Sequence, residues 1–245
     1  MKNYKFNLSY DGTRYFGWEH QPNTDMTIQG KLEQVLSLMV DGPVTVIGAG
    51  RTDAGVHARS MTANALLDTE MTPEEIQAYM NRYLPEDISI NDVKQAADRF
   101  HSRFNAKGKT YRYTLWYGEG KPVFDRKYTT VLDRKPNLLL MEQAASLLTG
   151  MHDYRAFCGN SRMKKSTIRV VDTIRIESQN HYIRIYFHGN GFLQNMVRIL
   201  VGTLLAVSYG DIEVSDIPGI LESKDRTKAG PTAPPQGLCL MKVDY

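Results

Sequence analysis

Polar and apolar residues alternate along several parts of this chain, and a period of two predicts β-strands. The first such segment is 4–10, which ends at the turn-forming pair Asp11-Gly12. In chain order, the other segments expected to form strands are 44–47, 61–67, 88–93, 109–117, 168–176, 182–187 and 238–243. Residues 178–180 lie between two of these segments and predict a hairpin turn.

Apolar residues spaced three and four positions apart predict helices between these strands. Thr27 caps the first helix, whose apolar stripe consists of Ile28, Leu32, Val35, Leu36 and Met39. A second helix begins at 72–75, where Thr-Pro-Glu-Glu combines a cap, a first-turn proline and acids at the positive end of the helix dipole. Two further helices are expected over 138–148, stopped by Gly150, and over 191–207.

Each half of the chain offers three or four strands and two helices. This mixture predicts an α+β protein with two lobes that meet edge to edge. The expected lobes are 1–104, which carries a glycine-rich loop, and 105–245, with the boundary near 104–107.

The composition is that of a soluble globular protein, with 42% hydrophobic and 23% charged residues among 245. The formal net charge of +3 is mildly basic, which permits a polyanionic partner without requiring one. Cys158 and Cys239 form no metal-ligand pattern, so a reduced cytoplasmic setting is expected. The N-terminus alternates in polarity, unlike a signal peptide, and the most apolar run, 196–207, is too short to cross a membrane.

The most informative segment is 46–58, an apolar run that ends in a loop of glycine and alanine. Glycine permits positive φ and close approach of other groups, and such a loop costs conformational entropy, so it usually holds something in place. Only three ionisable side chains, Arg51, Asp53 and His57, interrupt this segment. Asp53 is the only carboxylate between positions 41 and 68, and we therefore predict that it carries the chemistry.

The familiar glycine-loop motifs do not fit this segment. A dinucleotide-binding fingerprint that starts at Gly48 needs a third glycine where Asp53 stands. A phosphate-binding loop needs Lys and then Ser or Thr after its last glycine, and neither follows Gly55. No cluster of His, Cys or Asp offers a metal site. An ordinary structural turn with a capping aspartate remains the alternative to a catalytic loop.

The helix expected over 191–207 is apolar nearly all round, which predicts that it is buried. Arg198 in its middle therefore needs an anionic partner or a bound phosphate, because an unpaired buried charge costs several kcal/mol. Asp53 is a candidate partner, and arginine at such a site would keep the carboxylate ionised. A structural ion pair with Asp211 or Glu213 is the alternative.

Basic residues stand beside aromatic ones in several places. This mixture suits nucleic acid, because Lys and Arg contact phosphates while aromatic faces stack on unpaired bases. Solvated strand faces have the same composition, so the pattern alone does not decide. The segments concerned are 99–104, 107–113, and Arg162 with Lys164, Lys165 and Arg169.

Six motifs, in order along nearly the whole chain, resemble those of the tRNA pseudouridine synthase A (TruA) family. The run Arg51-Thr52-Asp53-Ala54-Gly55-Val56-His57 is the most specific of them. The others are Tyr10-Asp11-Gly12-Thr13 with Gly17-Trp18, Phe100-His101-Ser102-Arg103-Phe104, Lys109-Thr110-Tyr111-Arg112-Tyr113, Gly191-Phe192 with Met196-Val197-Arg198, and Lys224-Asp225-Arg226-Thr227. One departure is Glu19, where the family usually has Gln.

The resemblance implies a fold and an activity. The expected fold is two ferredoxin-like or RRM-like lobes joined into one mixed, mostly antiparallel sheet flanked by helices, with an active-site cleft between the lobes. The expected activity is the isomerisation of uridine to pseudouridine at positions 38, 39 and 40 in the anticodon stem-loop of tRNA. The family works without cofactor or metal, as a homodimer in which each tRNA touches both subunits.

The resemblance also assigns roles to single residues. Asp53 matches the essential aspartate, Arg198 the arginine that pairs with it, and Tyr111 the tyrosine that stacks on the target base. An ordinary core position is the alternative for Tyr111, because it shares its strand face with Leu115. Arg51 matches the residue implied in extruding that base from its helix. The further residues expected to bind the RNA are Arg14, His57, Arg103 and Lys107.

Two other classes of function remain alternatives at this point. A non-catalytic RNA-binding protein built from two sheet-based modules has the same basic and aromatic residues. A glycoside or nucleoside hydrolase that uses Asp53 normally needs a second carboxylate nearby, and the loop offers none.

Overall fold

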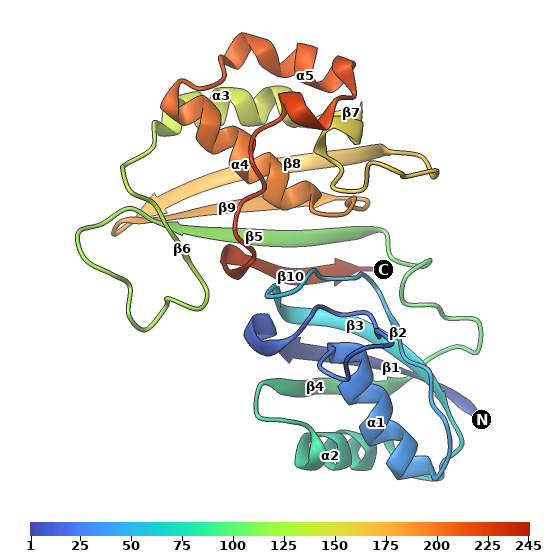
Figure 1. The fold of residues 1–245 in the computed structure, drawn as a ribbon. Coiled ribbons are helices and arrows are strands. Elements are labelled where there is room, and N and C mark those ends of the chain that lie inside the picture. The colour runs from blue at the N-terminus through green and yellow to red at the C-terminus, as the bar shows by residue number, and fades with distance from the viewer. The chain divides into compact units, whose positions relative to one another are not determined.

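The computed structural model describes residues 1–245, which divide into two compact units (Figure 1). Unit 1 comprises Met1–Lys107 together with Leu240–Tyr245, and unit 2 comprises Gly108–Cys239. These units differ from the expected lobes 1–104 and 105–245 because the C-terminal residues belong to unit 1. The lobes themselves, as functional domains, stay a prediction.

Unit 1 is a sheet with two helices, and its strands follow the order β4-β1-β3-β10. β1 pairs antiparallel with both β3 and β4, and the short β2 pairs antiparallel with β3. The elements are β1 (Lys2–Tyr10), η1 (Gly12–Arg14), α1 (Ile28–Val40), β2 (Ile47–Gly48), β3 (His57–Leu67), α2 (Pro73–Tyr83), β4 (Ile88–Gln95) and β10 (Leu238–Asp244). Only the residues of β10 from Leu240 onward belong to unit 1.

The alternation in β1 buries one face of the strand, so that Tyr4, Phe6, Leu8 and Tyr10 all enter the core. Both helices of unit 1 begin where the sequence predicts. The Thr27 hydroxyl accepts the Gly30 N–H at 3.1 Å and caps α1. At α2, Thr72 and Glu75 form a reciprocal capping box, in which the Glu75 carboxylate accepts the Thr72 N–H at 2.8 Å.

Unit 2 has the strand order β5-β9-β8-β7, with all three neighbouring pairs antiparallel, and β6 pairs parallel with β5. Helix α3 packs beside α4 (Figure 1). The strands and longer helices are β5 (Gly108–Trp116), β6 (Thr130–Val131), α3 (Leu138–Leu148), β7 (Gly150–Asp153), β8 (Ile168–Gln179), β9 (Tyr182–Gly189), α4 (Met196–Tyr209) and α5 (Ile217–Ser223). The 3-10 helices are η2 (Tyr154–Phe157), η3 (Val214–Asp216), η4 (Arg226–Lys228) and η5 (Pro235–Gly237).

Both units are α+β with mostly antiparallel strands flanked by helices, which confirms the predicted fold class. The predicted hairpin of 168–176 and 182–187 is present as β8 and β9. Its turn lies at Asn180-His181, where φ is 50° and 66°, rather than over 178–180, because β8 continues to Gln179. A cleft between the two lobes stays a prediction. None of the helices combines the length and the apolar character that a bilayer crossing requires.

Two predicted elements have the wrong bounds. The segment 44–47 is a strand only at Ile47–Gly48, because β2 forms just two pairs with β3. The helix expected from 191 begins at Met196, because Asn195 has a φ of 58° and this left-handed conformation cannot continue a right-handed helix. The sequence analysis also missed three short elements, β6, β7 and α5.

Candidate active site

The predicted site residues are divided between the two units. Tyr111 and Arg198 belong to unit 2. Unit 1 contains the other six, which are Arg14, Arg51, Asp53, His57, Arg103 and Lys107. Arg51 and Asp53 lie on the loop between β2 and β3 of unit 1, and His57 is the first residue of β3. The pairing of Asp53 with Arg198 stays a prediction.

Asp53 lies half-buried on the loop between β2 and β3. Its carbonyl accepts the Val56 N–H at 3.1 Å, which closes a tight turn at Ala54-Gly55. A carboxylate in this position is neither sealed in the core nor freely mobile on the surface. The arrangement suits a group that must meet a substrate in a defined geometry.

The segment from Tyr10 to Trp18 braces this loop on both sides of Asp53. Trp18 donates its N–H to the Thr52 carbonyl at 3.0 Å, and Tyr10 shares a hydrogen bond with the Thr52 hydroxyl at 2.8 Å. On the other side, Gly55 donates its N–H to the Tyr15 carbonyl at 3.3 Å. The backbone on either side of Asp53 is therefore fixed by bonds from a distant part of the sequence.

Gly12 makes this close packing possible. A Cβ at this position would lie 2.0 Å from the Val56 carbonyl oxygen, so any larger residue would push the two segments apart. The requirement explains why the turn after β1 uses glycine.

His57 is 4% exposed and holds the same turn. Its Nδ1 accepts the Gly12 N–H at 3.0 Å and lies 3.2 Å from the Asp11 carboxylate. These contacts give His57 a positioning role within unit 1, and its predicted contact with RNA stays a prediction.

Arg51 lies exposed beside Asp53 and forms an ion pair with Glu19. The Nη2 to Oε1 distance is 2.7 Å, and the two side chains are 55% and 50% exposed. Exposed pairs of this kind are worth about 0–1 kcal/mol. The pair can therefore separate at little cost.

Arg14 is held by Asp87, which lies directly before β4. Its Nε donates to one carboxylate oxygen at 2.7 Å, and the Tyr15 hydroxyl donates to the other at 2.6 Å. Burial, together with the hydrogen bond to Asp87, raises the pKa of Tyr15 to about 12. Asp87 therefore holds both Arg14 and Tyr15 in place.

Arg103 and Lys107 have exposed side chains, as residues that bind RNA phosphates require. Next to Arg103, the His101 ring stacks on Phe104 with centroids 4.1 Å apart, and Phe104 is 79% exposed. An exposed aromatic ring beside a cation suits an unpaired base. The sequence analysis did not single out Phe104, although the alternation of basic and aromatic residues in 99–104 pointed to this segment.

Tyr111 is 8% exposed on β5. Its ring meets Phe192 edge to face with centroids 5.2 Å apart. The contact fixes the plane of the tyrosine ring, which is the property that stacking on a target base would need. The stacking itself stays a prediction.

Arg198 is the third residue of α4 and is half-buried, so the expectation of a charge in the middle of a buried helix is wrong. Its Nε donates to the Ala233 carbonyl at 2.7 Å and its Nη1 to the Asn195 amide oxygen at 2.8 Å. These two hydrogen bonds orient the guanidinium. The alternative pair with Asp211 or Glu213 is also wrong, because roughly 16 Å of helix separates Arg198 from the end of α4.

A segment that follows the Lys224–Thr227 motif holds Arg198 in place. Arg226 donates from Nη1 to the Gly230 carbonyl at 2.9 Å and from Nη2 to the Thr232 hydroxyl at 3.0 Å. Ala233, a few residues on, returns its N–H to the Arg198 carbonyl at 3.1 Å. Arg226 is thus a positioning residue that the sequence analysis noticed only as part of a motif.

The segment reaches α4 because the helix carries Gly202 at the contact. A Cβ there would lie 1.7 Å from the Pro231 carbonyl oxygen. The Gly230 N–H also donates to the Thr203 hydroxyl at 2.9 Å, which adds a second fixed point on the helix.

No group of three or more His, Cys, Asp and Glu side chains that could hold a metal ion is present.

Comparison with known proteins assigns the chain to a family. A family model described as tRNA pseudouridine synthase matches residues 8–105 and 144–245. The chain belongs to the tRNA pseudouridine synthase family. The matched residues include the Asp53 loop, the start of α4 and Arg226, whereas Lys107 and Tyr111 lie outside them.

Several known proteins are similar to this chain over its full length. A tRNA pseudouridine synthase A of a Bacillus species is 45% identical over 245 residues, with 100% of both chains covered. A tRNA pseudouridine synthase A 2 of Bacillus cereus is 43% identical, and a tRNA pseudouridine synthase A of Clostridium acetobutylicum is 42% identical, with the same coverage. The protein is thus an isomerase that forms pseudouridine in tRNA.

Proposed function

We propose that this enzyme converts uridine to pseudouridine at positions 38, 39 and 40, in the anticodon stem-loop of tRNA. The observation that carries the proposal is the half-buried carboxylate of Asp53, on a loop whose backbone is held by hydrogen bonds on both sides. The full-length similarity to proteins named tRNA pseudouridine synthase A supports the same assignment.

The reaction is an exchange of bonds within one nucleotide. The bond between C1′ and N1 of the uridine breaks, the detached uracil turns, and C1′ joins C5. The C5 proton is lost and N1 gains one, so atoms and electrons balance without an oxidant or reductant. One ionised carboxylate is enough for this chemistry, either as a nucleophile towards sugar or base or as a base towards the 2′ proton.

The other residues prepare the nucleotide for Asp53. Arg198 pairs with the Asp53 carboxylate and keeps it ionised, because a neighbouring cation favours the charged form. Extruding the target uridine from its stack costs roughly a few kcal/mol. Insertion of Arg51 and stacking on Tyr111 offset this cost.

The exposed cations of unit 1 bind the RNA around the target. Arg14, Arg103 and Lys107 contact phosphates, while His57 keeps the loop in shape and borders the bound nucleotide. The enzyme acts in the cytoplasm as a homodimer in which each tRNA touches both subunits. It uses neither a cofactor nor a metal ion.

The test is to incubate the protein with unmodified tRNA transcripts and to map pseudouridine at single-nucleotide resolution. We expect conversion at positions 38 to 40 wherever a transcript has uridine there. Free uracil in the supernatant would indicate a hydrolase instead. Unchanged uridine throughout the anticodon arm, with bound and folded protein present, would leave only the RNA-binding alternative.

A further inference from the structure

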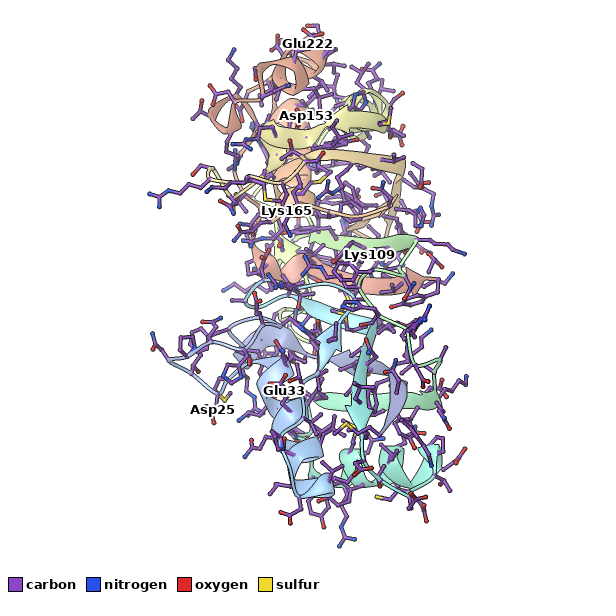
Figure 2. All side chains as sticks on the ribbon, turned by 90° about the vertical axis from the view of Figure 1, so that its right-hand side faces the viewer. Asp25, Glu33, Lys109, Asp153, Lys165 and Glu222 are labelled. Atoms are coloured by element: carbon purple, nitrogen blue, oxygen red, sulfur yellow. The ribbon has the colours of Figure 1, made fainter.

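An exposed basic loop, residues 159–166, connects η2 to β8 in unit 2. It contains Arg162, Lys164 and Lys165 and no carboxylate, so its formal charge of +3 equals the net charge of the whole chain. Figure 1 shows the loop as a yellow segment before the start of β8, and Figure 2 labels Lys165 on it.

Arg155 anchors the middle of this loop from within. Its guanidinium donates to the Met163 carbonyl at 2.7 Å and to the Ser161 carbonyl at 3.0 Å. The Met163 N–H donates to the Asn160 carbonyl at 3.2 Å, which closes a turn within the loop. Arg155 thus stabilises the backbone conformation of the loop.

Both ends of the loop are anchored as well. At the start, Gly159 donates its N–H to the Gln194 carbonyl at 2.8 Å. At the end, Arg169 donates from Nη1 to the Ser166 carbonyl at 3.0 Å. A loop held at three places presents its side chains in a preformed arrangement, so a ligand that binds them has less entropy to remove.

The three cations of the loop have no ion-pair partner in the structure. The carboxylates that flank the loop in sequence are engaged elsewhere: Asp153 pairs with Lys224 at 3.1 Å, and Asp172 pairs with His188 at 2.6 Å. The loop therefore keeps its full positive charge for a ligand outside the chain.

The base of the loop adjoins the residues that orient Arg198. Gly159 lies so close to Asn195 that a Cβ on the glycine would be 2.6 Å from the Asn195 amide nitrogen. Asn195 in turn accepts the hydrogen bond from Arg198. A ligand on the loop thus lies next to the residues that hold the proposed partner of the catalytic aspartate.

We propose that loop 159–166 is a phosphate-binding site for the RNA strand next to the target nucleotide. The inference rests on the proposed function, since it takes tRNA as the ligand. Arg162, Lys164 and Lys165 each contact a backbone phosphate, and Arg155 keeps them in register. The contacts position the strand without reading its sequence, because phosphates carry no base identity.

The test replaces the three cations with glutamine (R162Q/K164Q/K165Q) and measures binding to an anticodon stem-loop RNA over a series of KCl concentrations. Each phosphate contact contributes about 0.7 to the slope of log affinity against log salt for single-stranded RNA. The slope should therefore fall by about 2, and Kd at moderate salt should rise about 10-fold or more. KM for tRNA should rise in parallel while kcat stays unchanged.

A matched control exists in the same unit. Lys121, Arg126 and Lys127 are exposed, and they also consist of two lysines and one arginine. The variant K121Q/R126Q/K127Q loses the same charge and should change Kd by less than about 2-fold. Circular dichroism and melting temperature establish that both triple variants are folded.

The outcomes separate the two proposals. Wild-type affinity and salt slope in R162Q/K164Q/K165Q would overturn the loop assignment, and so would equal losses in both triple variants, which would indicate a general charge effect. The proposed function fails on a different result, namely the absence of pseudouridine when the wild-type protein acts on tRNA.

Discussion

Arg51 is paired with a carboxylate, Glu19, before any RNA is bound. In the proposed reaction Arg51 must leave this partner to replace the extruded base. Glu19 therefore competes with the RNA for the same guanidinium. The competition is mild because both side chains are half-exposed to water.

Glu19→Gln removes the competitor and one negative charge. We expect Kd for tRNA to fall by about 2- to 5-fold, which corresponds to the 0.5–1 kcal/mol of an exposed pair. The measurement is fluorescence anisotropy with a labelled anticodon stem-loop. Glu70→Gln is the control, because Glu70 is also exposed and pairs only loosely with Lys2 at 3.8 Å. Identical affinities of the two variants would contradict a role for the Glu19 contact.

At the scale of elements, the start of α4 and the segment 229–233 act as one part. Arg198 lies on the helix, and its Nε donates a hydrogen bond to the Ala233 carbonyl of the segment. Arg226 keeps that segment against the helix through Gly230 and Thr232. A change at Arg226 should therefore reach the reaction only through Arg198.

Arg226→Ala tests this dependence. We expect kcat to fall about 10-fold with little change in KM for tRNA, because one fixed guanidinium is loosened and the RNA contacts remain. Residues that act through one another show non-additive effects. In an Arg198→Ala background, Arg226→Ala should thus have almost no further effect on kcat. Additive losses in kcat would show that Arg226 does not act through Arg198.

At the scale of the whole molecule, the sequence predicts an element well when its signals are local. Helix α2 is an example, since its cap, proline and glutamate all stand within four residues. The prediction is wrong where long-range pairing decides. Val44 and Val46 are buried like strand residues, but the ladder beside them extends only to Ile47 and Gly48.

The candidate site follows the same division. Asp53 could be found from the sequence because no other carboxylate stands near it, and Arg198 because it interrupts an apolar run. Most of the contacts that hold the loop around Asp53 could not be found, because backbone groups of Tyr15 and Trp18 form them. Backbone hydrogen bonds between distant segments do not depend on which residues form them, so the sequence does not reveal them. An exception is a position where close packing requires glycine, such as Gly12.

The central claim is that the Asp53 carboxylate itself carries out the isomerisation. Asp53→Asn keeps the size of the side chain and removes its charge. The decisive measurement is the single-turnover rate of pseudouridine formation at positions 38 to 40, with enzyme in excess over a tRNA transcript. We predict a loss of about 10³-fold or more, with Kd for the same tRNA within about 3-fold of wild type. Pseudouridine formation by Asp53→Asn at a rate near that of wild type would contradict the account.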